Sequence, residues 1–413
     1  MQIINKVPIH QQCSLNILII SYWDFQDEGM QVTRLTPLYF ARQGHHVTFM
    51  VHSETTAGRS RQAVHHPNLE VCRFNLPLKW MNRIHILGRL RQLILFALYC
   101  LWNVARIYHQ GRKPDIIYAA ECDAILIGLL MRRLFKVPLV SRYYGVSTML
   151  LAHPFKHLFY HLSLKCPTDM AIVTDDGTDG ERVIRSLNSR IGVLHFWRNG
   201  IDQPYIDREK LSFFRKRYGF RPHDLVLIMA SRLYSWKRVD RAIKAVQPLI
   251  QAKKMKLRLL IVGDGPEKPN LEKLAERLGI KDIVNLAGPI AHKDIYNHYA
   301  LADVFLSCYD MSNVGNPLWE ALNIGKCIVV LNTGKTGDVI KDGVNGLLVE
   351  PTLEEENTVQ GISQAISRIY NDVKLRKRLA LGAKTYGERM LWTWEERLER
   401  ELASLKKLAR KAS

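Results

Sequence analysis

The sequence lacks a long, uninterrupted hydrophobic segment. The apolar run from Leu93 to Trp102 has ten residues, whereas a membrane-spanning helix needs about 20. We therefore interpret this run as too short to cross a bilayer. The early run LNILII has the length of a strand and lacks the extended apolar core and small-residue cleavage site of a secretory signal. We expect a cytoplasmic protein.

The sequence also lacks a cysteine or histidine pattern typical of disulfides or metal sites. Its seven cysteines are odd in number, scattered and mostly in apolar runs, which favours small core residues in a reducing compartment. The pairs His45-His46 and His65-His66 have no convincing set of partner ligands. The segment Asp175–Gly177 is typical of a turn at a strand end rather than of a metal clamp. We expect no metal in the chemistry of this protein.

Acidic residues are scarce in the first half of the chain. From Met30 to Tyr160 there are 17 Lys and Arg against five Asp and Glu, a net charge of +12 within a chain total of +20. Such a surface suits nucleic acid or anionic lipid. We find no nucleic-acid recognition motif and expect no nucleic-acid partner.

The segment from Leu87 to Lys113 combines the ten-residue apolar run with basic flanks. It suits a buried helix, which a run of this length favours, or a helix lying in a membrane interface with its arginines near headgroups. A second basic and apolar stretch, His153 to Lys165, favours the membrane alternative. The two stretches together lead to the hypothesis of a peripheral protein at the inner face of the cell membrane, with an anionic membrane surface as a partner.

Length and composition predict two α/β domains. The chain has 413 residues and 47% hydrophobic content, which exceeds what one core usually covers. Apolar runs of strand length alternate with helical stretches, without internal repeats or low-complexity segments. We expect two Rossmann-like sheets that bind ligands in a cleft between their carboxyl ends, and a domain boundary between Asn199 and Arg221. Strands are predicted near 16–21, 47–51, 116–119, 138–141, 170–174 and 193–197, and again near 225, 259, 284, 304 and 327.

The segment from Ser307 to Val349 predicts a binding site for a diphosphate. ADVFLSC reads as a strand and Asn316-Pro317-Leu318 opens a helix, because proline suits the first helical turn. Free backbone N–H groups and the helix dipole at such a turn favour a diphosphate. Glu320, one turn further on, would accept hydrogen bonds from ribose hydroxyls. Alternatively, Glu320 only occupies a first helical turn, where acidic residues are common.

A second strand and loop, LVLIMASRLYSWK, adds two cations. Arg232 and Lys237 follow the buried strand 225–230. Fixed cations stabilise a departing nucleoside diphosphate more than its ground state, and a guanidinium fork with a point charge suits its oxygens. Taken alone, basic residues in loops are usually solvated. The next strand ends in IVGDGP, where Gly263 allows close backbone approach.

The order of SRLYSWK, IVGDGP, NPLWEAL, GKCIVV and DGVNGLLV resembles that in the retaining glycosyltransferases of family four (group 1), which have the GT-B fold. The resemblance is dense from Leu225 to Pro351 and extends to RNGID at 198–202. It implies an acceptor-binding domain at 1–205, a nucleotide-sugar-binding domain at 206–384, and C-terminal helices at about 385–413 that cross back onto the first domain.

The resemblance also implies the roles of individual residues. Arg232 and Lys237 would hold the donor diphosphate, Glu320 the ribose, and Ile290 would lie near the base. The acceptor or the sugar would meet Tyr144, Gly145 and Asn199. The donor-binding positions implied are Gly29, Gly263, Ile290, Ser312, Asn313, Val314, Gly315, Asn316, Pro317 and Leu318.

The chain departs from the family pattern at three positions. Ser312 stands where the family usually has a second glutamate that contacts the transferred sugar. Either Asp310 or the Ser312 hydroxyl substitutes, or the backbone of residues 313–316 recognises the sugar, or activity is weak or lost. Tyr144 replaces a histidine of many relatives, and tyrosine is a poor base near neutral pH. Gly29 stands alone where the family often has a glycine pair.

The resemblance implies transfer of a sugar from a nucleoside-diphosphate sugar to an acceptor hydroxyl with retention, in bacterial glycan, glycolipid or glycosylated-metabolite synthesis. The donor is a co-substrate, no further cofactor is expected, and a lipid-linked acceptor is one candidate. Two alternatives stay open because fold does not fix reaction. One is a catalytically degenerate protein that binds a nucleotide sugar or a partner, and the other is a nucleotide-sugar epimerase or hydrolase.

Overall fold

The computed structural model describes residues 14–23, 31–52, 66–74, 85–252 and 254–412. The chain divides into two compact units. The N-terminal unit comprises Met1–Thr174, Glu181–Trp197 and Glu395–Ser413, and the C-terminal unit comprises Asp175–Gly180 and Arg198–Trp394. Each unit contains its own parallel sheet.

The N-terminal unit is built on a seven-stranded parallel sheet. Its central strands are buried along nearly their whole length because helices cover both faces, and they therefore read as continuous apolar runs. The strands, in spatial order, are β3 (Leu69–Phe74), β2 (His46–His52), β1 (Asn16–Ser21), β4 (Ile116–Ala120), β5 (Leu139–Tyr143), β6 (Thr168–Thr174) and β7 (Ile191–Trp197).

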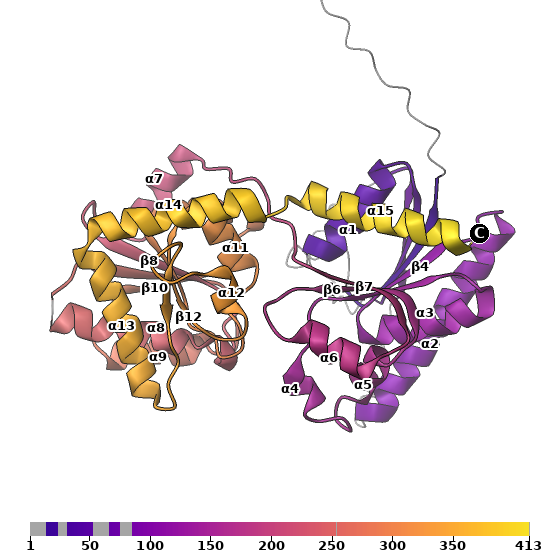
Figure 1. Cartoon of the computed structure of the whole chain (residues 1–413), viewed down its shortest axis with the longest axis horizontal. Coiled ribbons are helices and arrows are strands. Elements are labelled where there is room, and N and C mark those ends of the chain that lie inside the picture. The colour runs from indigo at the N-terminus through magenta and orange to yellow at the C-terminus, as the bar shows by residue number, and fades with distance from the viewer. Residues whose placement is uncertain (1–13, 24–30, 53–65, 75–84, 253, 413) are drawn as a thin grey trace, which may run out of the picture. The chain divides into compact units, whose positions relative to one another are not determined.

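Helices lie on both faces of this sheet, and the two layers have separate cores. One core contains side chains of α2, α3, α5 and α6, and the other contains side chains of α1 and the C-terminal helix α15. In Figure 1, α1 and α15 lie on one side of the sheet and α2, α3, α5 and α6 on the other. The helices are α1 (Gln31–Arg42), α2 (His85–His109), α3 (Cys122–Phe135), α4 (Thr148–Leu151), α5 (Leu158–Leu164), α6 (Gly180–Leu187) and α15 (Trp394–Ala412).

The C-terminal unit is built on a six-stranded parallel sheet. The strands, in spatial order, are β10 (Val284–Gly288), β9 (Leu257–Val262), β8 (Leu225–Ala230), β11 (Val304–Ser307), β12 (Cys327–Leu331) and β13 (Leu347–Val349). Its helices are α7 (Arg208–Arg217), η2 (Ser235–Lys237), α8 (Val239–Gln251), α9 (Lys268–Arg277), η3 (His292–Asp294), α10 (Ile295–Leu301), α11 (Asn316–Asn323), α12 (Thr336–Val339), α13 (Glu355–Asn371) and α14 (Val373–Met390).

Every strand predicted from the sequence is present, and two strands were not predicted. β3 is only partly buried at five of its six positions and mixes apolar with charged residues, so it shows no apolar run. β13 has only three residues. Both lie at an edge of their sheet, where one side of the strand has no neighbour and the apolar signal is weakest.

Helix α2 corrects the interpretation of the first apolar run. The helix has 25 residues, and within it Gly88–His109 is long and apolar enough to cross a membrane by length and composition alone. The length of this segment therefore does not argue against a membrane-spanning helix. Phe96, Cys100 and Val104 pack into the core of the N-terminal unit, so one face of α2 belongs to the protein interior. The opposite face is exposed.

Candidate functional site

The carboxyl ends of β8 and β11 lie side by side at the centre of the C-terminal sheet. Connections leave these two strands toward opposite edges, since β9 and β10 follow on one side and β12 and β13 on the other. In open parallel sheets, ligands bind outside the carboxyl ends of the strands at this switch point. Arg232 and Lys237 follow β8, and Ser312 and Glu320 follow β11.

The ammonium group of Lys237 lies among aromatic rings. Its Nζ is 4.1 Å from the ring centroid of Trp236 and 3.6 Å from that of Tyr309. Burial and the neighbouring charge of Arg232 lower the pKa of Lys237 to about 7, while the ring faces favour the cation. The guanidinium group of Arg232 lies 5.7 Å from the Tyr234 ring. Both cations sit where an anionic ligand would relieve their mutual repulsion.

Ion pairs fix the loop that carries Lys237. Arg241 is nearly buried, and its guanidinium donates to Asp310 Oδ1 at 2.7 Å and to Glu355 Oε2 at 2.8 Å. Arg238, in the left-handed conformation with φ 47°, pairs with the same two carboxylates. Asp310 is therefore engaged by two arginines, and this commitment speaks against its replacing the missing glutamate.

Glycines allow the loops after β8 and β9 to pack backbone against backbone. A Cβ atom on Gly263 would lie 1.8 Å from the carbonyl oxygen of Ser231, and one on Gly265 would lie 2.5 Å from that of Leu233. Both glycines have positive φ. The close backbone approach predicted at Gly263 is thus made, at least in part, to another segment of the protein. This contact positions the loop that carries Arg232.

Asn313 holds the turn after β11. Its Oδ1 accepts hydrogen bonds from the Ser307 hydroxyl and the Tyr309 N–H, and its Nδ2 donates to Leu331 O and Thr333 Oγ1. The side chain is 2% exposed. The side-chain amide of Asn313 therefore holds the turn in place through hydrogen bonds within the protein.

The other residues predicted to bind the donor are either buried or partly exposed to solvent. Ser312, Val314 and Leu318 are buried, so their side chains contribute to packing. Gly315, Asn316 and Pro317 are partly exposed at the start of α11. The Asn199 side chain donates to Asn316 Oδ1 at 3.2 Å, which brings these two predicted residues together.

Glu320 is partly exposed and has several polar neighbours. The Tyr299 hydroxyl donates to its Oε2 at 2.9 Å, and His292 Nε2 lies 3.9 Å from its Oε1. His292 Nδ1 is 3.3 Å from Asp202 Oδ2. Burial raises the pKa of Glu320 to about 7, with a smaller contribution from the charge of Asp202. Ile290, two residues before His292, packs against the core cluster that contains Leu318.

In the N-terminal unit, the predicted residues Tyr144 and Gly145 follow the end of β5. The Tyr144 hydroxyl lies 3.1 Å from Thr33 Oγ1, and its N–H donates to Glu121 Oε1 at 2.6 Å. Burial raises the pKa of Tyr144 to about 12, so its hydroxyl keeps its proton near neutral pH and is even less available as a general base than that of a free tyrosine. Gly145 follows with φ 137°. Burial also raises the pKa of Glu121, at the end of β4, to about 7.

Several neighbours of the predicted residues, within one unit or the other, were not predicted from the sequence. These are Glu121, Asp176, His292, Tyr299 and Tyr309. Each follows a strand or lies on a helix beside a predicted residue, but no local pattern distinguishes it from an ordinary polar or core residue. Gly29 lies outside the described residues.

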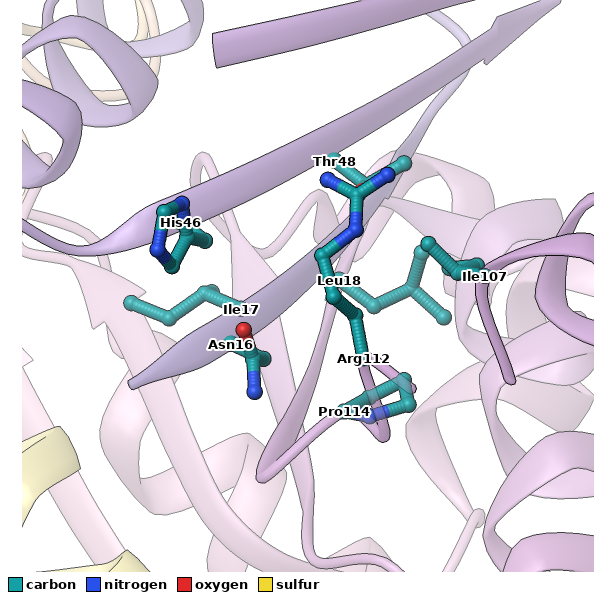
Figure 2. Close-up of a pocket in the computed structure, with 8 residues that line it drawn as sticks. All are labelled: Asn16, Ile17, Leu18, His46, Thr48, Ile107, Arg112 and Pro114. Carbon is teal, nitrogen blue, oxygen red and sulfur yellow. The ribbon is translucent and has the colours of Figure 1, made fainter. Parts of the chain in front are cut away.

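A small cavity at the opposite end of the N-terminal sheet is not a substrate site. It lies where β1 and β2 begin, between Asn16, His46 and Arg112 (Figure 2). Its volume of about 10 Å³ is at the lower limit for a single water. Within the described part of the chain, no group of three or more His, Cys, Asp or Glu side chains is arranged to hold a metal ion. The six cysteines in this part are free thiols.

Comparison with known proteins gives a family for the C-terminal unit. Residues 212–386 match the family model "Glycosyl transferases group 1". The alpha-D-kanosaminyltransferase of Streptomyces kanamyceticus is 25% identical over 68% of this chain and 75% of the relative. The alpha-monoglucosyldiacylglycerol synthase of Streptococcus pneumoniae is 25% identical over 57% of this chain and 55% of the relative. The chain thus spans about half the length of the second relative.

Solved structures share the fold of nearly the whole chain. A sucrose-phosphate synthase from Thermosynechococcus elongatus has a TM-score of 0.74 at 18% identity, covering 97% of this chain and 100% of that one. An Anabaena protein in complex with UDP-glucose has a TM-score of 0.67 at 19% identity, covering 94% and 100%. The chain has the GT-B fold of two Rossmann-like halves, and its residues 212–386 form a group 1 glycosyltransferase domain.

Proposed function

We propose that the protein transfers a sugar from a nucleoside-diphosphate sugar to an acceptor hydroxyl, with retention of the anomeric configuration. The observation that carries this proposal is the position of Arg232, Lys237 and Glu320. All three stand after β8 and β11 at the switch point of a group 1 glycosyltransferase domain. The fold relative bound to UDP-glucose supports a nucleotide sugar as donor.

The arrangement suggests how the donor is held and activated. The diphosphate lies against Arg232 and Lys237 and the free N–H groups at the start of α11, and the ribose hydroxyls donate to Glu320. As the sugar bond breaks, negative charge grows on the departing phosphate, and both cations stabilise it more than the ground state. The departing phosphate takes the proton of the attacking hydroxyl on the same face, so the protein supplies no nucleophile and no metal.

We further propose a lipid-linked acceptor and a place of action at the inner membrane surface. On α2, Leu90, Ile94, Leu98 and Trp102 are 41% to 63% exposed and recur every four residues, so they share one face. Residues 85–165 contain eleven Lys and Arg against three Asp and Glu. An exposed apolar row in a basic surface suits an anionic bilayer. The Streptococcus pneumoniae relative, an alpha-monoglucosyldiacylglycerol synthase, also supports a lipid acceptor.

Turnover of a donor panel tests the proposal. Purified protein is incubated with UDP-, GDP-, ADP- and dTDP-sugars, with and without bacterial lipid extract, and products are followed by mass spectrometry. We expect one donor class to give a glycosylated product that depends on the extract, and Arg232→Ala to abolish it. Arg277→Ala, at an exposed arginine of α9, is the matched control and should retain it.

The other outcomes distinguish the alternatives. Donor cleavage without any acceptor would indicate an epimerase or hydrolase. Donor binding without cleavage or transfer would indicate a degenerate binding protein. Absence of both binding and turnover would contradict the proposed function.

A further inference from the structure

The loop Asp175–Gly180 packs directly against the turn that follows β11. It comes after β6 in the chain but belongs to the C-terminal unit. Gly177 has φ +73°, and a Cβ atom there would lie 2.3 Å from Val314 Cβ and 2.4 Å from Ser312 Oγ. On its other side, the Lys335 N–H donates to Gly177 O at 2.7 Å. The loop is thus held from two directions, and glycine is the residue that fits.

This contact packs Gly177 against the side chain of Ser312. The Ser312 side chain is 7% exposed, and its Oγ accepts a hydrogen bond from the Val314 N–H at 3.1 Å. Gly177 lies directly against the Ser312 hydroxyl, since even one added Cβ atom at position 177 would come within 2.4 Å of Ser312 Oγ. Ser312 is therefore turned into the protein, and a hydroxyl placed this way does not substitute for a sugar-binding carboxylate.

The same loop carries the Asp176 carboxylate, one residue before the glycine that contacts Ser312. Asp176, next to Gly177, is only partly exposed. Its Oδ1 accepts hydrogen bonds from the Thr178 N–H at 3.1 Å and the Thr178 hydroxyl at 2.6 Å. Both bonds fall on one oxygen, Oδ1, of the Asp176 carboxylate.

Asp176 also shares an electrostatic environment with the two cations of the site. Its negative charge acts on Lys237 to raise the pKa of that ammonium, opposing the effects of burial and of Arg232. A sugar is bonded directly to the diphosphate that Arg232 and Lys237 would hold. Ionised carboxylates accept hydrogen bonds from hydroxyl groups readily, so a carboxylate whose charge acts on Lys237 is a candidate partner for the hydroxyls of that sugar.

We propose that Asp176 binds the transferred sugar, its Oδ2 accepting hydrogen bonds from sugar hydroxyls in place of the acidic side chain absent at position 312. The inference rests on the proposed function, because it takes the ligand to be a nucleotide sugar with its diphosphate at Arg232 and Lys237. The Asp176 carboxylate gives the donor site specificity for the sugar, and the cations give it affinity for the diphosphate.

Comparing intact donors with the matching nucleoside diphosphates tests this role. Dissociation constants of UDP-glucose, UDP, GDP-mannose and GDP are measured by titration calorimetry for wild type and Asp176→Asn. We expect Asp176→Asn to weaken binding of the preferred nucleotide sugar by about 10-fold, since a hydrogen bond to a charged acceptor is lost. Binding of its nucleoside diphosphate should stay nearly the same, because removing a negative charge near the phosphates favours binding while the accompanying decrease in the pKa of Lys237 opposes it.

Two matched variants separate sugar binding from a structural role of the loop. Thr178→Val removes the hydroxyl bond to Oδ1 and keeps the carboxylate, and Asp179→Asn changes an exposed carboxylate of the same loop. Both should bind donor and diphosphate like wild type. An equal loss of both ligands in Asp176→Asn, or no loss of either, would overturn the inference while leaving the proposed function in place. Wild-type protein that binds none of the four ligands would contradict both.

Discussion

At the scale of single residues, the candidate site contains a lysine and a glutamate whose pKa values both lie near neutrality. Burial lowers the pKa of Lys237 to about 7 and raises that of Glu320 to about 7. Each group is therefore only partly in its charged form at neutral pH. The proposed donor contacts need both charged forms, the ammonium for the diphosphate and the carboxylate for the ribose.

We predict that affinity for the nucleotide sugar passes through a maximum near neutral pH. As pH falls below about 7, Glu320 gains a proton and loses acceptor capacity; as pH rises above about 7, Lys237 loses its charge. Titrations from about pH 5.5 to about pH 9 measure this dependence. Glu320→Gln should flatten the acid limb and Lys237→Met the alkaline limb. Affinity that stays constant over the range in wild type would show that these groups do not titrate in the free site.

The sequence predicted which strand ends carry Arg232, Lys237 and Glu320, but not the contacts that hold the neighbouring side chains. Arg232, Lys237 and Glu320 could be identified because strand, loop and helix are local patterns. Asn313 could not be identified as the anchor of its turn, because its partners Leu331 and Thr333 belong to the next strand and loop. The proximity of Asp176 to Ser312 is likewise invisible in the sequence, since 136 positions separate them.

At the scale of secondary-structure elements, helix α2 faces the protein core on one side and solvent on the other. Its inner face packs with the sheet of the N-terminal unit, and its outer row at 90, 94, 98 and 102 remains exposed. The sequence alternatives of a core helix and an interface helix did not include a division of the helix into a buried face and an exposed face. A helix of 25 residues has room for a buried stripe and an exposed stripe. The two stripes could not be distinguished in the sequence, because both consist of apolar residues.

We predict that the outer row of α2 binds anionic membranes. The double variant Ile94→Ser and Leu98→Ser should reduce binding to phosphatidylglycerol vesicles by at least about 10-fold in a sedimentation assay at low salt, because two apolar side chains no longer enter the interface. Leu381→Ser, at a 68% exposed leucine of α14 in the C-terminal unit, is the control and should leave binding unchanged.

Vesicle composition gives a second check on α2. Binding should weaken with added salt and on uncharged phosphatidylcholine vesicles, because basic residues contribute to the attraction. Wild-type protein that ignores anionic vesicles, or a double variant that binds them equally well, would contradict the membrane proposal without affecting the proposed sugar transfer.

At the scale of the whole molecule, two parallel sheets follow from the alternation of buried strands and helices. Continuous apolar runs marked the central strands of both sheets, because strands covered on both faces leave no polar alternation. The edge strands β3 and β13 escaped prediction because they are partly exposed or short. The helix α15 packs on the N-terminal unit through Leu402, Leu405 and the hydrogen bond from Tyr118 to Glu401. Such a pairing between residues 283 positions apart is set by tertiary structure.

The central claim is that the carboxyl ends of β8 and β11 hold the diphosphate of a nucleotide sugar. Calorimetric titration of UDP and GDP into wild type, Lys237→Met and Lys273→Met tests it most directly, since Lys273 is an exposed lysine of α9 in the same unit. We predict that wild type binds one of the two ligands, that Lys237→Met weakens this binding by at least about 10-fold, and that Lys273→Met does not. Equal affinities for all three proteins, or no binding by wild type, would contradict the claim.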